Sequence, residues 1–245
     1  MILRQFLHQD PIGISYLFGC GGQAIGAAVD PVGDPERYLQ AAQELGLRIA
    51  YVIDTHVHAD HLSAGPQLAT MAGGEYVLSA AADVAVPFKA VGGGDVLALG
   101  NVVAEVIQTP GHTPEHLYLL VTDRTRGDEP WFLFTGHTLM AGDLGRTELA
   151  TTVEAGARDL FRSARRLASL PDYVEVLPGA YSGSVCGRSL SGKPWSTIGF
   201  EKRHNEAFGI LDERAFVERM TADIPPPPDA DRIRAINAGR AAAAA

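Results

Sequence analysis

The stretch Thr55-His56-Val57-His58-Ala59-Asp60-His61 places three histidines and a carboxylate within six residues. The apolar, β-branched run 49–53 before it predicts a buried strand, and residues 62–71 after it have the apolar spacing of a helix. The cluster therefore lies on a loop between two rigid elements. Neutral imidazole and carboxylate are ligands for zinc, iron or manganese. Because the whole chain has eight histidines, this concentration favours a metal site over a polar surface loop.

The composition limits the classes of protein to which the chain can belong. Its 245 residues can form one large domain or two small ones, and its net charge of −9 argues against a surface for nucleic acid or anionic membranes. The two cysteines, Cys20 and Cys186, cannot make a disulfide framework, so we expect a reducing, cytoplasmic location. No apolar run approaches the ~20 residues of a transmembrane helix, and the N-terminus lacks a signal-peptide pattern.

Hydrophobic periodicity predicts short strands that alternate with amphipathic helices. Strands are expected at residues 1–6, 12–18, 24–29, 49–53, 75–79, 97–99, 102–107, 117–121, 131–134 and 174–177. Helices are expected at residues 35–45, 62–71, 153–170, 215–222 and 231–237. A stiff polyproline connector is expected at 225–228, and the alanine-rich end is expected to fray. This pattern predicts a layered α and β domain.

Three further motifs each follow a predicted strand. Proline and glycine in Thr109-Pro110-Gly111-His112 force a loop, which presents His112 as a ligand candidate. Thr135-Gly136-His137 comes next and is followed by Gly142-Asp143-Leu144-Gly145-Arg146. Pro178-Gly179-Ala180-Tyr181 ends the series. We expect these loops to meet the first motif at one edge of the molecule.

Taken together, the motifs resemble the THxHADH and TPGHT signatures of the metallo-β-lactamase superfamily. Residues 183–187 and 196–201 resemble the GSxCG and STIG segments of its persulfide dioxygenases, including members fused to rhodanese modules. The resemblance covers nearly the whole chain. It implies an αββα sandwich, in which two packed mixed sheets have helices outside. We expect a single domain at residues 1–245, with 200–245 as a C-terminal helical cap.

Two positions depart from the family pattern. The family has an aspartate ligand where this chain has His137, and a histidine ligand of the second metal where it has Ala180. In the persulfide dioxygenases the positions of His56, His112 and His137 hold one Fe(II). The resemblance therefore implies one metal ion per chain on three histidines, with Fe(II) favoured over Zn(II). A second ion is not expected, because one imidazole nitrogen cannot bridge two metals as a carboxylate does.

For most of the other motif residues, the sequence allows more than one role. His58 is either a direct ligand, as in the hydrolases, or a hydrogen-bond partner of the ligands, together with Asp60 and His61. Asp143 is a less favoured substitute for the missing carboxylate. Arg146 is either half of a surface ion pair or a clamp for a substrate carboxylate. Tyr181 is either a substrate contact or a wall of the cleft.

Cys186 is either a reactive thiol near the site or, as is more common for a free cysteine, a packing residue without chemical function.

Three functions follow from the resemblance. The first is an Fe(II) persulfide dioxygenase that acts on a glutathione persulfide-like thiol. The second is a glyoxalase II-like thioester hydrolase, of the hydroxyacylglutathione hydrolase type. The third is a metal-binding homologue with altered activity. The expected partner is a small-molecule thiol, persulfide or thioester, with no nucleic acid and no membrane, and a homodimer is left open.

Overall fold

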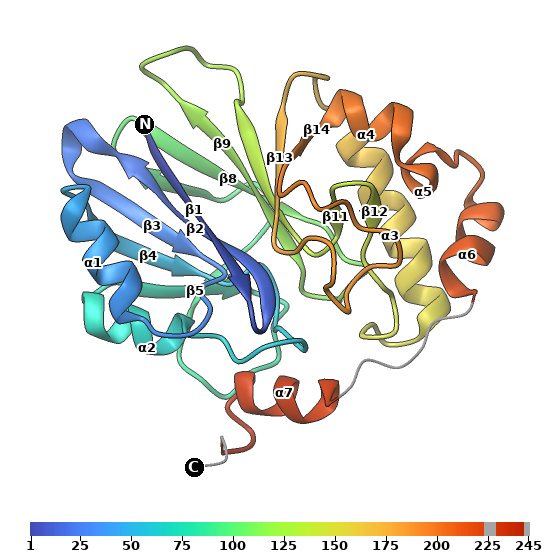
Figure 1. Cartoon of the computed structure of the whole chain (residues 1–245), viewed down its shortest axis with the longest axis horizontal. Coiled ribbons are helices and arrows are strands. Elements are labelled where there is room, and N and C mark those ends of the chain that lie inside the picture. Colours follow the sequence, from blue (N-terminus) through green and yellow to red (C-terminus); the bar gives the residue numbers. More distant parts are fainter. Residues whose placement is uncertain (223–228, 243–245) are drawn as a thin grey trace.

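The computed structural model of the chain describes residues 1–222 and 229–242. The predicted polyproline connector at 225–228 and the last three alanines lie outside the described residues. Two six-stranded sheets face each other, and helices cover their outer faces (Figure 1). The expected αββα sandwich is confirmed.

The first sheet is mixed and runs in the order β1-β2-β3-β4-β5-β6. Its strands are β1 (Ile2–Gln9), β2 (Ile12–Cys20), β3 (Ile25–Val29), β4 (Arg48–Ile53), β5 (Glu75–Ser79) and β6 (Lys89–Val91). β1, β2 and β3 pair antiparallel, whereas β3 to β6 pair parallel. A one-turn η1 (Gly21–Gln23) connects β2 to β3. The helices α1 (Glu36–Glu44) and α2 (Gly65–Ala72) cover its outer face.

The second sheet runs in the order β14-β13-β10-β9-β8-β7. Its strands are β7 (Val96–Leu99), β8 (Val102–Gln108), β9 (Leu117–Asp123), β10 (Phe132–Gly136), β13 (Glu175–Pro178) and β14 (Ser196–Thr197). The ribbon of β11 (Leu139–Met140) and β12 (Asp143–Leu144) stands beside it. Its outer face is covered by α3 (Val153–Ala168), α4 (Ile198–His204), α5 (Glu206–Gly209) and α6 (Glu213–Thr221).

The side chains of β2 alternate between the two faces of the first sheet, so this strand contributes to both hydrophobic clusters. Tyr16 and Phe18 point between the sheets, while Leu17 points outward to the cluster under α1 and α2. The ring of Phe134 from β10 lies 4.8 Å from that of Tyr16 and 4.9 Å from that of Phe18. Burial of such aromatic pairs stabilises the contact between the two sheets.

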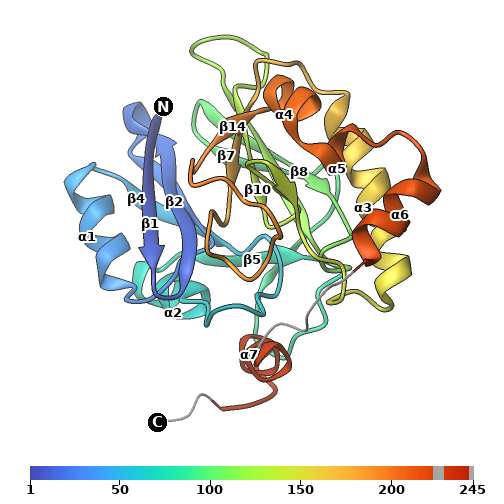
Figure 2. The ribbon, with the colours of Figure 1, turned by 45° about the vertical axis from the view of Figure 1, so that its right-hand side comes forward.

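The predicted C-terminal cap divides into two parts. Helices α4 to α6 pack with α3 on the second sheet, whereas α7 (Ala230–Asn237) lies apart from them in both views (Figures 1 and 2). Asn237 of α7 contacts the loop after β4 instead. The assignment of all residues to a single domain remains our proposal.

Parallel pairing sets the position of the site. The ends of β3 and β4 lie side by side in the first sheet, and the ends of β10 and β13 do so in the second. Because the carboxyl ends of parallel strands meet at one edge of a sheet, the four sequence motifs converge there. The loops after β4, β8 and β10 each contribute one histidine to a cluster of three at this edge.

Candidate metal centre

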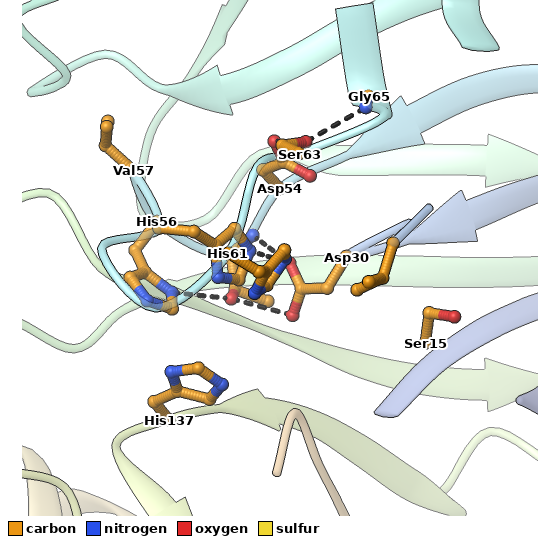
Figure 3. A network of polar contacts seen from close by, with 12 residues as sticks. Ser15, Asp30, Asp54, His56, Val57, His61, Ser63, Gly65 and His137 are labelled. Atoms are coloured by element: carbon orange, nitrogen blue, oxygen red, sulfur yellow. Dashed lines mark hydrogen bonds and ion pairs between the residues drawn. The ribbon is translucent and has the colours of Figure 1, made fainter. Parts of the chain in front are cut away.

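Three histidines form the centre of the site. One ring nitrogen from each of His56, His112 and His137 lies within 4.8 Å of those of the other two, and all three residues are buried. His56 follows β4 of the first sheet, whereas the other two follow β8 and β10 of the second. In Figure 3, His137 lies across from His56 and the loop that carries it. The three predicted ligands therefore converge from both halves of the molecule.

Hydrogen bonds assign the tautomers of His56 and His112. The hydroxyl of Thr55 donates to Asp30 Oδ2 at 2.9 Å, so it accepts from Nδ1–H of His56 at 3.0 Å. Nδ1–H of His112 donates to the carbonyl oxygen of Arg146 at 2.8 Å. Nε2 of both rings then carries a lone pair, and neither Nε2 has a hydrogen-bond partner. Buried, unpartnered lone pairs that face one another fit a bound metal ion.

Electrostatics keep the three rings neutral. Burial, helped by the neighbouring histidines, holds the pKa of His56 well below its usual range. Burial and the nearby His137 lower the pKa of His112 to about 3. Burial also lowers the pKa of His137. Neutral imidazole is the form that binds a metal ion, so the cluster is ready to bind at neutral pH.

Asp30, at the end of β3, organises the loop beside the three histidines. Its Oδ1 accepts from the backbone N–H of Thr55 at 2.7 Å and from Nε2–H of His58 at 3.1 Å. Burial works against the charged form of His58, but Asp30, Asp60 and Asp54 outweigh it and hold the pKa well above the usual range. His58 is thus turned to a carboxylate and stands outside the three-histidine cluster. Nδ1 of His58 has no hydrogen-bond partner, so both of its predicted roles, direct ligand and hydrogen-bond partner of the ligands, stay predictions.

Asp60 lies between two groups of histidines. Its Oδ1 is 3.2 Å from Nδ1 of His61 and 3.6 Å from Nδ1 of His58, while its Oδ2 is 3.9 Å from Nε2 of His137. Burial works to raise the pKa of Asp60, but His61 and His137 outweigh it, so the pKa lies well below the usual range. Asp60 therefore supplies a negative charge beside the centre.

Four residues of the site were missed by the sequence reasoning. Asp30 comes directly after the strand expected at 24–29 and was not among the predicted site residues. Glu115 Oε1 accepts from the backbone N–H of Val57 at 2.9 Å. Nε2 of the buried His116 accepts from the backbone N–H of His137 at 3.3 Å. From α7, Asn237 Nδ2 donates to the carbonyls of His58 and His61 at 2.9 and 2.8 Å.

A sequence signal exists for two of the four. His116 comes four residues after His112, and Asp30 comes directly after β3, the strand that pairs with β4.

Asp143 and Arg146 are directed to other partners. Asp143 Oδ2 accepts from the backbone N–H groups of Arg188 and Ser189 at 2.5 and 2.9 Å, so the structure does not place it as a substitute ligand. The buried guanidinium of Arg146 forms an ion pair with Glu148 at 2.8 Å. The carbonyl of Arg146 supports His112, whereas a substrate clamp by its side chain stays a prediction.

Tyr181 and Cys186 lie on the segment that follows β13. The hydroxyl of Tyr181 donates to the carbonyl of His8 at 2.7 Å, which ties this segment to the β1–β2 turn. Its role as a substrate contact stays a prediction. Cys186 is buried against Met140 and Ala180, and its ligand atom lies within 4.8 Å of those of Asp60 and His137. Burial, with Asp60 nearby, raises the pKa of its thiol well above the usual range.

Comparison with known proteins places the chain in a family. No family model matches. A probable metallo-hydrolase of Burkholderia pseudomallei is 32% identical over 204 residues, which cover 70% of this chain and 69% of that protein. A hydroxyacylglutathione hydrolase of Synechococcus is 32% identical over 66% of this chain and 62% of its own length. The mitochondrial persulfide dioxygenase ETHE1 of Mus musculus is 28% identical, over 73% and 67%. The chain thus spans about two thirds of the length of these relatives.

Solved structures agree with these relatives. A metallo-β-lactamase of Staphylococcus aureus superposes with a TM-score of 0.92 at 33% identity, over 97% of this chain and 72% of that one. ETHE1 from Myxococcus xanthus gives a TM-score of 0.84 at 30% identity, over 98% and 100%. The chain belongs to the metallo-β-lactamase superfamily, in its branch of persulfide dioxygenases and glyoxalase II-like proteins. It is an enzyme of the dioxygenase or hydrolase type.

Membrane insertion through a helix is not supported. Within residues 1–222 and 229–242, every helix is too short or too polar to cross a bilayer. This agrees with the hydropathy of the sequence.

Proposed function

We propose that the chain is an Fe(II)-dependent dioxygenase of a glutathione persulfide-like substrate. The observation that supports this most is the face of three neutral imidazoles, His56, His112 and His137, whose donor atoms converge without a shared carboxylate. Three histidines with open positions suit a non-haem iron centre, with Zn(II) as the alternative ion. Iron held there would supply the redox chemistry for the overall reaction GSSH + O₂ + H₂O → GSH + H₂SO₃.

The chain's own residues would bind and orient the sulfur. A face of three neutral ligands leaves a bound cation with one more unit of positive charge than two histidines and a carboxylate do. This excess favours an anionic persulfide. His58, held by Asp30 through Nε2–H, keeps Nδ1 at 3.6 Å from Asp60, where it can hold a proton close to the centre. The thioester hydrolase is the second candidate, because the loop 55–61 is intact and a hydroxyacylglutathione hydrolase is among the relatives.

Oxygen uptake tests the proposal. The purified chain loaded anaerobically with Fe(II) is given glutathione persulfide in an oxygen electrode, and in parallel S-lactoylglutathione in a thioester assay. We expect oxygen uptake with sulfite formation and little thioester hydrolysis. His112→Ala should lose both bound iron and oxygen uptake, because it removes one of three donors.

The possible results separate the candidates. Thioester hydrolysis without oxygen uptake would reverse the ranking in favour of the hydrolase. A chain that binds iron and turns over neither compound would support the metal-binding homologue with altered activity.

A further inference from the structure

Glu115 is a buried acidic residue on the loop that carries His112, three residues further along the chain. Its Oε1 accepts a hydrogen bond from the backbone N–H of Val57 at 2.9 Å. Val57 directly follows His56, and its side chain points away from His137 (Figure 3). The carboxylate of Glu115 therefore holds the backbone immediately after a candidate ligand.

The same loop also holds the backbone immediately before His56. The N–H of Leu117 donates to the carbonyl of Thr55 at 2.9 Å. The segment 115–117 thus provides one hydrogen bond on each side of His56. Because β4 belongs to the first sheet and β8 to the second, these two bonds join ligand-bearing loops of different sheets. They constrain the separation of His56 and His112, whose ring centroids are 4.9 Å apart.

The bond from Glu115 is the one of these two that depends on a side chain. A hydrogen bond to a carboxylate is stronger than one between neutral groups. Arg234 of α7 lies 3.5 Å from Oε2, so the second oxygen has a cationic partner and the buried charge is not left isolated. Within residues 1–222 and 229–242, Glu115 belongs to none of the clusters of candidate metal ligands. Its effect on a bound ion therefore passes through His56.

We propose that Glu115 is a positioning residue of the metal centre, which orients His56 relative to His112 through the backbone N–H of Val57. A ring that is turned away from its best direction binds the ion less tightly. Loss of groups that orient ligands commonly lowers metal affinity by about 10–100-fold. The proposal rests on the three-histidine centre of the proposed function, and it stands whether persulfide or a thioester is the substrate.

Two conservative substitutions separate the hydrogen bond of Glu115 from its charge. Glu115→Gln removes the charge but keeps an oxygen of the same reach, which still accepts from the N–H of Val57. Glu115→Asp keeps the charge, but its shorter side chain withdraws the carboxylate from that N–H. The metal-free chains are titrated with Co(II) without oxygen, in competition with a chromophoric chelator. We expect Glu115→Asp to bind about tenfold more weakly than wild type and to shift the visible d–d spectrum, while Glu115→Gln keeps both affinity and spectrum.

Asp83→Ala is the matched control. Asp83 forms an ion pair with Arg240, just after α7, so this variant also removes the acidic partner of an arginine but keeps the bond to Val57. It should bind Co(II) as wild type does. Circular dichroism of the metal-free chains checks that each variant is folded.

Two results would overturn the proposal. One is wild-type affinity and spectrum in Glu115→Asp, and the other is binding by Glu115→Gln as weak as that by Glu115→Asp. Absence of oxygen uptake by the iron-loaded wild-type chain would instead refute the dioxygenase, and it would leave this comparison of affinities unchanged.

Discussion

His137 stands where the family pattern that the sequence resembles has an aspartate, and its surroundings explain how an imidazole is accommodated there. The backbone before it turns sharply at Gly136, whose φ is +47°. A Cβ at Gly136 would collide with the hydroxyl of Thr55 and lie 2.6 Å from Nε2 of His116. A Cβ at Gly179 would lie 2.9 Å from Cδ2 of His137. Gly179 thus leaves room for the ring of His137, while Gly136 provides the positive φ before it and the space beside Thr55 and His116.

Replacement of His137 by aspartate restores the family's ligand type. We expect His137→Asp to bind iron still, with a lower reduction potential and a changed rate of persulfide turnover, because the added negative charge favours the oxidised ion and weakens capture of an anionic sulfur. Metal titration and voltammetry on both forms measure this. The exposed His204 of α4 provides the matched control, and His204→Asp should leave affinity and potential unchanged. Unchanged values for His137→Asp as well would refute its role as a ligand.

His8 gives the fold a dependence on pH away from the metal centre. Burial, followed by the charges of Arg37 and His61, lowers the pKa of His8 to about 4, and its Nε2 lies 2.8 Å from the hydroxyl of Ser15. The unfolded chain binds this proton below pH ~6.5, so the stability that neutral His8 contributes is full above that pH. It is lost as the pH falls from ~6.5 to ~4, by at most about 1.4 kcal/mol per pH unit.

Urea unfolding measured at several pH values with a chelator present tests this. His8→Gln, which cannot titrate, should flatten the dependence between pH 6.5 and 4. An equally steep dependence in the variant would assign it to another group.

At the scale of elements, α7 holds the loop that carries the first motif in place through hydrogen bonds. Asn237 satisfies two carbonyls of that loop, at His58 and His61, and accepts from the N–H of Ser63 at 3.0 Å. Arg234, one turn earlier, donates to the carbonyl of Leu149 at 2.8 Å. One short helix therefore connects the loop after β4 with the segment before α3.

Loss of the hydrogen bonds between Asn237 and this loop should weaken metal binding. We expect Asn237→Ala to lower the affinity for the ion about tenfold, as the loss of groups that orient ligands commonly does, with a small loss of stability. Arg232→Ala, on the exposed side of the same helix, is the control and should bind as wild type. The comparison is made by competition with a chromophoric chelator. Equal affinities in the two variants would show that the loop holds its shape without α7.

The elements also show which parts of the structure were accessible from the sequence. An apolar run predicted β2, which is buried on both faces, and a period of 3.6 predicted α3, which is buried on one face. The short β6, β14, α4 and α5 were missed, because they are too short to show a period. Within the site, motif spacing found the three clustered histidines. It could not find Asn237, whose partner His58 is 179 residues away, because such a contact exists only after the chain folds.

At the scale of the whole molecule, the metal centre joins the two halves of the sandwich. His56 belongs to a loop of the first sheet, while His112 and His137 belong to loops of the second. The apolar contact between Phe134 and the rings of β2 holds the inner faces of the two sheets together. A bound ion adds a connection at the edge, where the packing consists of polar side chains. Binding to the native state alone must also stabilise that state.

Removal of the ion should therefore lower the melting temperature of the entire chain. At a free metal concentration of about 100 times Kd, the native state gains roughly 2.7 kcal/mol, or a few degrees for a protein of this size. We expect chelation to reverse this gain and His112→Ala to abolish it, since the variant cannot connect the sheets through the ion. Thermal unfolding followed by both circular dichroism and tryptophan fluorescence measures it. If metal raised the melting temperature of His112→Ala as much as that of wild type, the stabilising ion would sit elsewhere in the molecule.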